Sequence, residues 1–140
     1  MRYVLVTLVG GHKLYSMTLF WEYISKLNQP PEEIWVSCTK EIYDKCMGSY
    51  RLSIPIRHIH GDDDTGDDQI HSTTAAREAL RREIISSDYE WSMWLDNDML
   101  VPEDMVGIAD NILGDDPDLL WIHSYHPCRQ DSGETDRHGL

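Results

Sequence analysis

Two aspartates, Asp96 and Asp98, stand one residue apart directly after a short aromatic and apolar run, residues 89–95. The aromatic residues of that run favour a β-strand. At the end of a strand, both carboxylates can point to one place beyond the sheet edge, where ligands of open α/β sheets usually bind. Two hard oxygen ligands suit Mg²⁺ or Mn²⁺, and such an ion suits a pyrophosphate. The alternative is an acidic turn that caps a helix, because Pro102 and Glu103 follow closely.

A second group of chemically capable residues is His58, His60 and Asp62. On a strand, residues 58 and 60 share one face, and a carboxylate follows at once. A His-x-His pair beside an aspartate is typical of one half of a metal-dependent hydrolase site. Residues 60–68 contain no apolar side chain, so the alternative interpretation is a solvated acidic loop.

The composition limits the kinds of partner. The chain has 140 residues, of which 41% are hydrophobic, and this is enough for one domain with its own core. Its formal net charge is -13, from 25 acidic against 12 basic residues. That charge argues against nucleic acid or an anionic membrane as the main partner. An anionic substrate would need a metal cation to approach.

The cysteines and the N-terminal run indicate a compartment. Cys38, Cys46 and Cys128 are an odd number without Cys-x-x-Cys spacing, so they predict neither a disulfide framework nor a zinc site. A reducing compartment is the default for such a chain. The apolar run at residues 3–9 is too short to span a membrane, and no signal-like cleavage region follows it. We expect a cytoplasmic protein without a transmembrane segment.

Strand-like and helix-like segments alternate along the chain, which predicts an α/β fold with a mostly parallel sheet and flanking helices. Residues 1–126 form the expected domain, and the polar, aperiodic residues 127–140 form a tail. The hydrophobic patterns predict strands over 3–9, 33–38, 54–59, 89–95 and 118–123, and helices over 13–27, 40–47, 71–86 and 102–113.

The order of these motifs resembles the nucleotide-sugar-binding half of GT-A glycosyltransferases, in particular glycosyltransferase family 2. The likeness spans residues 2–125 and rests on four places. Thr7 ends a first strand that a loop and a helix follow, and residues 74–79 are similar to the family's Ala-Arg-Asn helix. Residues 92–98 resemble its strand ending in the Asp-x-Asp metal motif, and residues 101–105 resemble the start of the next helix. The resemblance implies a compact, Rossmann-like GT-A fold.

The resemblance also implies an activity, the transfer of a sugar from a nucleotide-diphosphate sugar to a glycan, protein or lipid acceptor. Mn²⁺ or Mg²⁺ would stabilise the departing diphosphate. In this picture Asp98 is the direct metal ligand, and Asp96 contacts the metal through water or binds the ribose. On an extended backbone Asn97 points the opposite way and could reach the sugar.

Four further residues are expected to bind the nucleotide. By the resemblance, Thr7 and the turn that begins at Val9 face the base, and Ser37 stands where family members commonly carry an aspartate. Arg77 matches an arginine that holds the nucleotide or braces the metal aspartates. The alternative for Arg77 is a solvated ion pair on a helix rich in charged residues.

The sequence leaves several alternatives open. No catalytic base can be assigned, because the family's base lies far downstream of the metal motif and this chain ends 42 residues after Asp98. A non-catalytic module that binds a nucleotide sugar is therefore a second hypothesis. The hydrolase site at His58, His60 and Asp62 is a third, and the oligomeric state is open.

Overall fold

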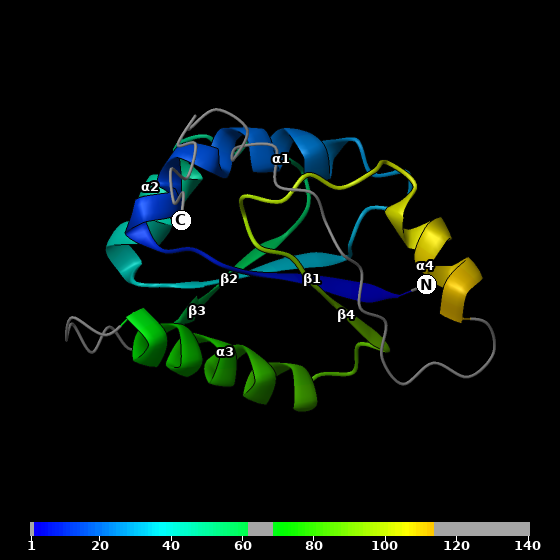
Figure 1. Cartoon of the computed structure of the whole chain (residues 1–140). Coiled ribbons are helices and arrows are strands. Elements are labelled where there is room, and N and C mark those ends of the chain that lie inside the picture. Colours follow the sequence, from blue (N-terminus) through cyan, green and yellow to red (C-terminus); the bar gives the residue numbers. More distant parts are fainter. Residues whose placement is uncertain (1, 62–68, 114–140) are drawn as a thin grey trace, which may run out of the picture.

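The computed structural model of the chain describes residues 2–61 and 69–113. Within these residues strands and helices alternate as predicted, and the fold is α/β (Figure 1). In chain order the elements are β1 (Tyr3–Leu8), the 3₁₀ helix η1 (Gly11–Ser16), α1 (Met17–Ser25), β2 (Glu33–Cys38), α2 (Lys40–Met47), β3 (Ile56–His60), α3 (Gln69–Ile85), β4 (Trp91–Trp94) and α4 (Met105–Leu113).

The four strands form one parallel sheet in the order β3-β2-β1-β4. The chain adds β2 and β3 on one side of β1 and then returns to place β4 on the other side. The direction of strand addition therefore reverses between β1 and β4. Ligands of open parallel sheets bind where this reversal leaves a crevice at the carboxyl ends of the strands. Residues 9–13 and 95–98 follow β1 and β4 at that edge.

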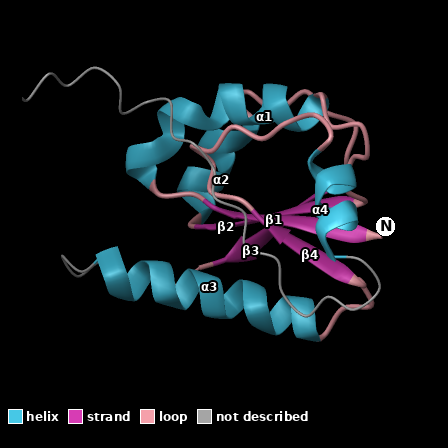
Figure 2. Ribbon diagram, turned by 45° about the vertical axis from the view of Figure 1, so that its right-hand side comes forward, coloured by secondary structure: helices cyan, strands magenta, loops and turns pink. Residues whose placement is uncertain are grey.

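Helices cover both faces of the sheet, as Figures 1 and 2 show, with α1 and α2 on one face and α3 on the other. Alternate side chains of β1 pack on the two faces of the sheet. Leu5 packs in the cluster with α1, and Val4 and Val6 pack in the cluster with Leu80 of α3. A strand buried on both faces reads as a continuous apolar run, because neither set of side chains meets water.

Most of the predicted elements are present, with some altered ends. The strand at residues 33–38 and the helix at 40–47 are confirmed at both bounds. The helix expected over 13–27 instead begins as the 3₁₀ helix η1 and becomes α-helical only at Met17. The helix expected from Pro102 begins at Met105, after a turn in which the Met105 amide donates to the Pro102 carbonyl.

Some of the sequence predictions concern residues outside the described ranges. The fifth strand at residues 118–123, the tail at 127–140 and Cys128 lie outside the described residues, as does Asp62. Cys38 and Cys46 are both buried. In the described ranges, each helix is too short or too polar to cross a lipid bilayer.

Candidate functional site

The Asp-x-Asp pair lies in a tight turn after β4. The strand ends at Trp94, and the Leu95 amide makes one more bond to the sheet by donating to the Val6 carbonyl at 3.0 Å. The Met99 amide then donates to the Asp96 carbonyl at 3.0 Å, which closes a turn over residues 96–99. Because the backbone turns here, the two-residue alternation of a strand does not decide where these side chains point.

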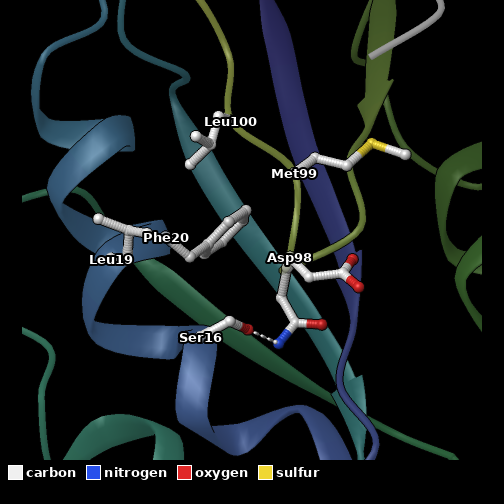
Figure 3. A pocket seen from close by; sticks show the side chains of 7 residues that line it. Ser16, Leu19, Phe20, Asp98, Met99 and Leu100 are labelled. Carbon is white, nitrogen blue, oxygen red and sulfur yellow. Dashed lines mark hydrogen bonds between the residues drawn. The ribbon is translucent and has the colours of Figure 1, made fainter. Parts of the chain in front are cut away.

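Asn97 points into the protein and not toward a ligand. Its side chain is 1% exposed. The Nδ2 group donates to the main-chain carbonyl of Lys13 at 2.9 Å and to the Ser16 hydroxyl at 2.8 Å; Figure 3 marks the bond to Ser16. The expected contact between Asn97 and a sugar depended on an extended backbone. In the structure Asn97 instead ties the Asp-x-Asp turn to the helical turn that follows β1.

Asp98 pairs with a lysine from the same helical turn. Lys13 Nζ lies 3.0 Å from Asp98 Oδ2. The other oxygen, Oδ1, is buried and has no hydrogen-bond partner among the described residues. Figure 3 shows the carboxylate directed away from the apolar side chains of Leu19, Phe20 and Leu100. A buried carboxylate oxygen without a hydrogen-bond partner is costly for the folded protein.

Helix capping does not explain the pair. The helix α4 starts at Met105, and the acidic residue directly before it is Asp104. The turn at residues 96–99 is separated from this helix by the buried Val101 and by Pro102. The two carboxylates are therefore not part of the first turn of α4.

A groove of about 390 Å³ opens at the carboxyl ends of β1 and β2. Its volume lies within the range of sites that hold small organic ligands, roughly 300–1,000 Å³. The segments that follow the four strands form its walls, together with α3. The lining residues are Leu8, Val9, Gly10, Gly11, His12, Lys13, Ser37, Cys38, Thr39, Ile42, Gly61, Thr73, Ala76, Arg77 and Asp96.

The groove brings together four of the residues expected to bind the nucleotide or the metal. They come from four separate stretches of the chain: Val9, Ser37, Arg77 and Asp96. Thr7 is not among the lining residues, because it is fully buried within β1. Asn97 and Asp98 line a neighbouring cavity of about 10 Å³, next to Ser16 and Phe20, and not the groove itself.

The hydroxyl groups at the end of β2 already have partners in the fold. Ser37 Oγ donates to the Ala76 carbonyl of α3 at 3.3 Å. Thr39 Oγ1 caps α2 by accepting from the Ile42 amide at 3.3 Å. Both residues line the groove, yet these bonds fix the end of β2 against α3 and α2.

Basic and acidic side chains both line the groove. Among the described residues, Lys13 and Arg77 are basic and Asp96 is acidic, in a chain whose formal net charge is -13. Among the described residues, the ion pairs within α3 join Glu78 to Arg81 and Arg82, and they hold the pKa of Glu78 at about 2. The solvated ion pair considered for Arg77 is thus formed by its neighbours. Arg77 contributes a positive charge to the groove, which favours an anionic ligand.

Sequence reasoning missed Lys13, which touches both the groove and Asp98. Its position in the sequence is the signal that could have identified it as a site residue, because it lies just after Gly10 and Gly11 in the segment that follows the first strand. A loop at this position of a parallel sheet faces the ligand crevice. The hydrophobic pattern instead placed Lys13 at the start of a helix, where a lysine usually meets solvent.

The histidine pair lies side by side on β3. The rings of His58 and His60 are 6.1 Å apart and nearly perpendicular. His58 Nε2 lies 2.7 Å from the Cys38 carbonyl, and its ring stacks on Tyr43 with centroids 4.5 Å apart. The carbonyl can only accept, so Nε2 carries the proton and cannot bind a metal at the same time. Within residues 2–61 and 69–113, no three His, Cys, Asp or Glu side chains gather as a metal site.

If a divalent cation binds at the Asp-x-Asp turn, Asp96 and Asp98 are the residues that would hold it. The turn offers the half-buried carboxylates of Asp96 and Asp98, and Asp98 Oδ1 has no partner in the described part of the chain. Oxygen ligands of this kind suit Mg²⁺ and Mn²⁺, which complete their shells with water and substrate phosphate. The ammonium of Lys13 at Oδ2 shows that the site already attracts positive charge.

No protein-family model matches this sequence, and no curated protein matches it. What the chain binds must therefore be inferred from its own residues. The groove, its cations and the adjoining Asp-x-Asp turn are the features that bear on that inference.

Proposed function

We propose that this protein is a metal-dependent glycosyltransferase with a GT-A fold, which transfers a sugar from a nucleotide-diphosphate sugar to a glycan, protein or lipid acceptor. The observation that carries the proposal is the groove of about 390 Å³ at the carboxyl edge of the sheet. Val9, Ser37, Arg77 and Asp96, four residues expected to meet such a donor, line this one groove.

Shape and charge both support a nucleotide diphosphate as the ligand. The groove lies at the end of β1, beside the reversal of strand order between β1 and β4, and it has a volume in the range of small-molecule sites. Lys13 and Arg77 would oppose the negative charge of the diphosphate in an otherwise acidic protein. Arginine suits this task, since its planar guanidinium can donate two parallel bonds to a phosphate.

Asp96 and Asp98 would hold Mn²⁺ or Mg²⁺ at the rim of the groove. Bound there, the ion would neutralise the charge that develops on the departing nucleoside diphosphate. Within the chain itself, Asn97 fixes the turn that carries both carboxylates, and Ser37 and Val9 shape the opposite wall of the groove. The Val9 amide donates to the Ser37 carbonyl at 3.1 Å, so these two residues hold each other in place.

Thermal unfolding with UDP and GDP, each with and without Mn²⁺, tests the binding step. A ligand that binds only the folded protein stabilises it by about 2.7 kcal/mol at a hundred times its Kd. We expect a rise in Tm that needs both nucleotide and Mn²⁺, and we expect D96N and D98N to lose it. The absence of a metal-dependent shift with either nucleotide would contradict the proposal.

Incubation with UDP- and GDP-sugars then tests catalysis. Release of the nucleoside diphosphate, measured in the presence of Mn²⁺ and abolished in D98N, is the expected result for a transferase. Metal-dependent binding of the donors without any release, in the presence of a panel of acceptors, would indicate a non-catalytic nucleotide-sugar-binding module.

A further inference from the structure

Lys13 is placed where it can serve both the Asp-x-Asp turn and the groove. Its Nζ lies 3.0 Å from Asp98 Oδ2, and Lys13 is among the residues that line the groove. The main chain of Lys13 is held on both sides. Its amide donates to the Gly10 carbonyl at 2.9 Å, and its carbonyl accepts from Asn97 Nδ2 at 2.9 Å. The backbone is thus fixed, and the ammonium can move only by rotation of its side chain.

The ion pair is only partly enclosed. The side chain of Lys13 is 30% exposed and that of Asp98 is 16% exposed. A lysine ammonium is a compact charge on a flexible four-carbon stem, so it can leave one anion for another nearby. Asp98 is the less movable partner, because it belongs to a turn that Asn97 anchors in the core.

A divalent cation and the Lys13 ammonium would compete for Asp98. Both are attracted to the same carboxylate, and at a separation of a few ångströms they repel each other. A metal that binds Asp98 therefore favours a side-chain position in which Lys13 Nζ has moved away. Lys13 also lines the groove, and a phosphate bound there would offer the displaced ammonium a new anionic partner.

We propose that Lys13 is a positioning residue that neutralises Asp98 in the metal-free protein and moves to a donor phosphate when the metal binds. This inference rests on the proposed function and adds to it a coupling between metal binding and nucleotide binding. Lys13 weakens the binding of metal alone and strengthens the binding of the nucleotide diphosphate that follows. Metal and nucleotide then bind cooperatively, since each favours the same position of one side chain.

The test compares K13M with the unaltered protein and with K40M. Methionine keeps much of the aliphatic stem and removes the charge. Lys40 is a matched control because it is exposed, pairs with Asp44 on α2 and is not among the groove residues.

Titration with MnCl₂ alone, followed by calorimetry, should show Mn²⁺ binding K13M about tenfold more tightly than the unaltered protein. Titration with UDP and GDP at saturating Mn²⁺ should show about tenfold weaker binding to K13M. K40M should change neither the affinity for Mn²⁺ nor the affinity for the nucleotides.

The two titrations keep this inference separate from the proposed function. If Mn²⁺ binds K13M no more tightly than the unaltered protein, or if nucleotide affinity is unaltered in K13M, the role of Lys13 is overturned while metal-dependent nucleotide binding stands. If Mn²⁺ does not promote nucleotide binding to the unaltered protein, the proposed function fails, and tighter Mn²⁺ binding by K13M would still establish the competition at Asp98. K13R, which keeps the charge, should bind Mn²⁺ alone as the unaltered protein does, and a tenfold gain in K13R would count against the competition. These binding readouts do not require turnover.

Discussion

The Asn97 side-chain amide donates a hydrogen bond to the main-chain carbonyl of Lys13 at 2.9 Å, across a sequence separation of 84 residues. This bond joins the turn after β4 to the helical turn after β1, at the place where strand order reverses. The residues that could hold a metal and those that could meet a phosphate are thus fixed relative to each other by one buried amide.

Replacing Asn97 with alanine should lower the free energy of unfolding by about 1–3 kcal/mol. The substitution removes the donor that the Lys13 carbonyl and the Ser16 hydroxyl share, although the carbonyl keeps the bond that it accepts from Ser16 Oγ at 2.8 Å. Urea unfolding followed by circular dichroism measures the change. N111A serves as the control, because Asn111 is exposed on α4 and should alter stability by less than about 0.5 kcal/mol. Equal effects of the two variants would contradict the buried anchor.

Replacing Thr7 with valine should leave stability unchanged or raise it by about 1 kcal/mol. Thr7 is fully buried, and its Oγ1 has no hydrogen-bond partner in the described ranges. Valine keeps nearly the same shape and removes the desolvated hydroxyl. S37A is the matched comparison, since it deletes the bonded hydroxyl that reaches the Ala76 carbonyl, and it should be destabilising. A loss of stability in T7V would reveal a partner for Oγ1, such as a buried water.

Replacing Arg77 with alanine should weaken nucleotide-diphosphate binding about 10–100-fold, the range expected when a charge-assisted hydrogen bond is lost. Arg81 provides a control one helical turn away on α3. Its guanidinium pairs with Glu78, and Arg81 is not among the groove residues. Calorimetric titration with UDP and GDP in the presence of Mn²⁺ distinguishes the two variants. If R81A weakens binding as much as R77A, Arg77 has no specific place in the site.

Replacing Asp98 with asparagine should abolish the Mn²⁺ dependence of nucleotide binding and change stability little. The substitution keeps the shape of the side chain and removes one partner of a pair whose lysine is 30% exposed, so the loss of stability should stay near or below 1 kcal/mol. D104N is the control, because Asp104 precedes α4 and lines neither the groove nor the small cavity. Mn²⁺ titrations of both variants, with thermal unfolding alongside, measure the two effects. Retention of full Mn²⁺ dependence in D98N would remove Asp98 from the metal site.

Cys46 should resist alkylation in the folded protein at pH 8. Burial raises the pKa of its thiol to about 11, so the reactive thiolate is scarce below that pH. In urea the thiol returns to a pKa near 8.5 and should react readily at pH 8. Mass spectrometry of the peptide that contains Cys46 reports both rates, and rapid labelling of the native protein at pH 8 would contradict the burial.

Local pattern was sufficient to predict much of the fold. The uninterrupted apolar run of β1 indicated a strand buried on both faces, and residues 33–38 and 40–47 were predicted to the residue. Prediction was weaker where a turn competes with a regular element. Gly10 and Gly11 led into a 3₁₀ helix, and Pro102 began a turn before α4, because both sites have backbone conformations that side-chain periodicity does not report.

The Asp-x-Asp pair shows what sequence alone determined about this protein and what the tertiary structure decided. The sequence determined that two carboxylates follow a strand, and that an arginine-bearing helix precedes it, because residue type and order are local properties. The structure decided that Asp96 lines the groove with Arg77, that Asp98 pairs with Lys13 and that Asn97 is buried. Those relations depend on strand order and on the turn at residues 96–99. The strand order and the anchoring of the turn by Asn97 arise from contacts between residues far apart in the chain, and no window of sequence contains them.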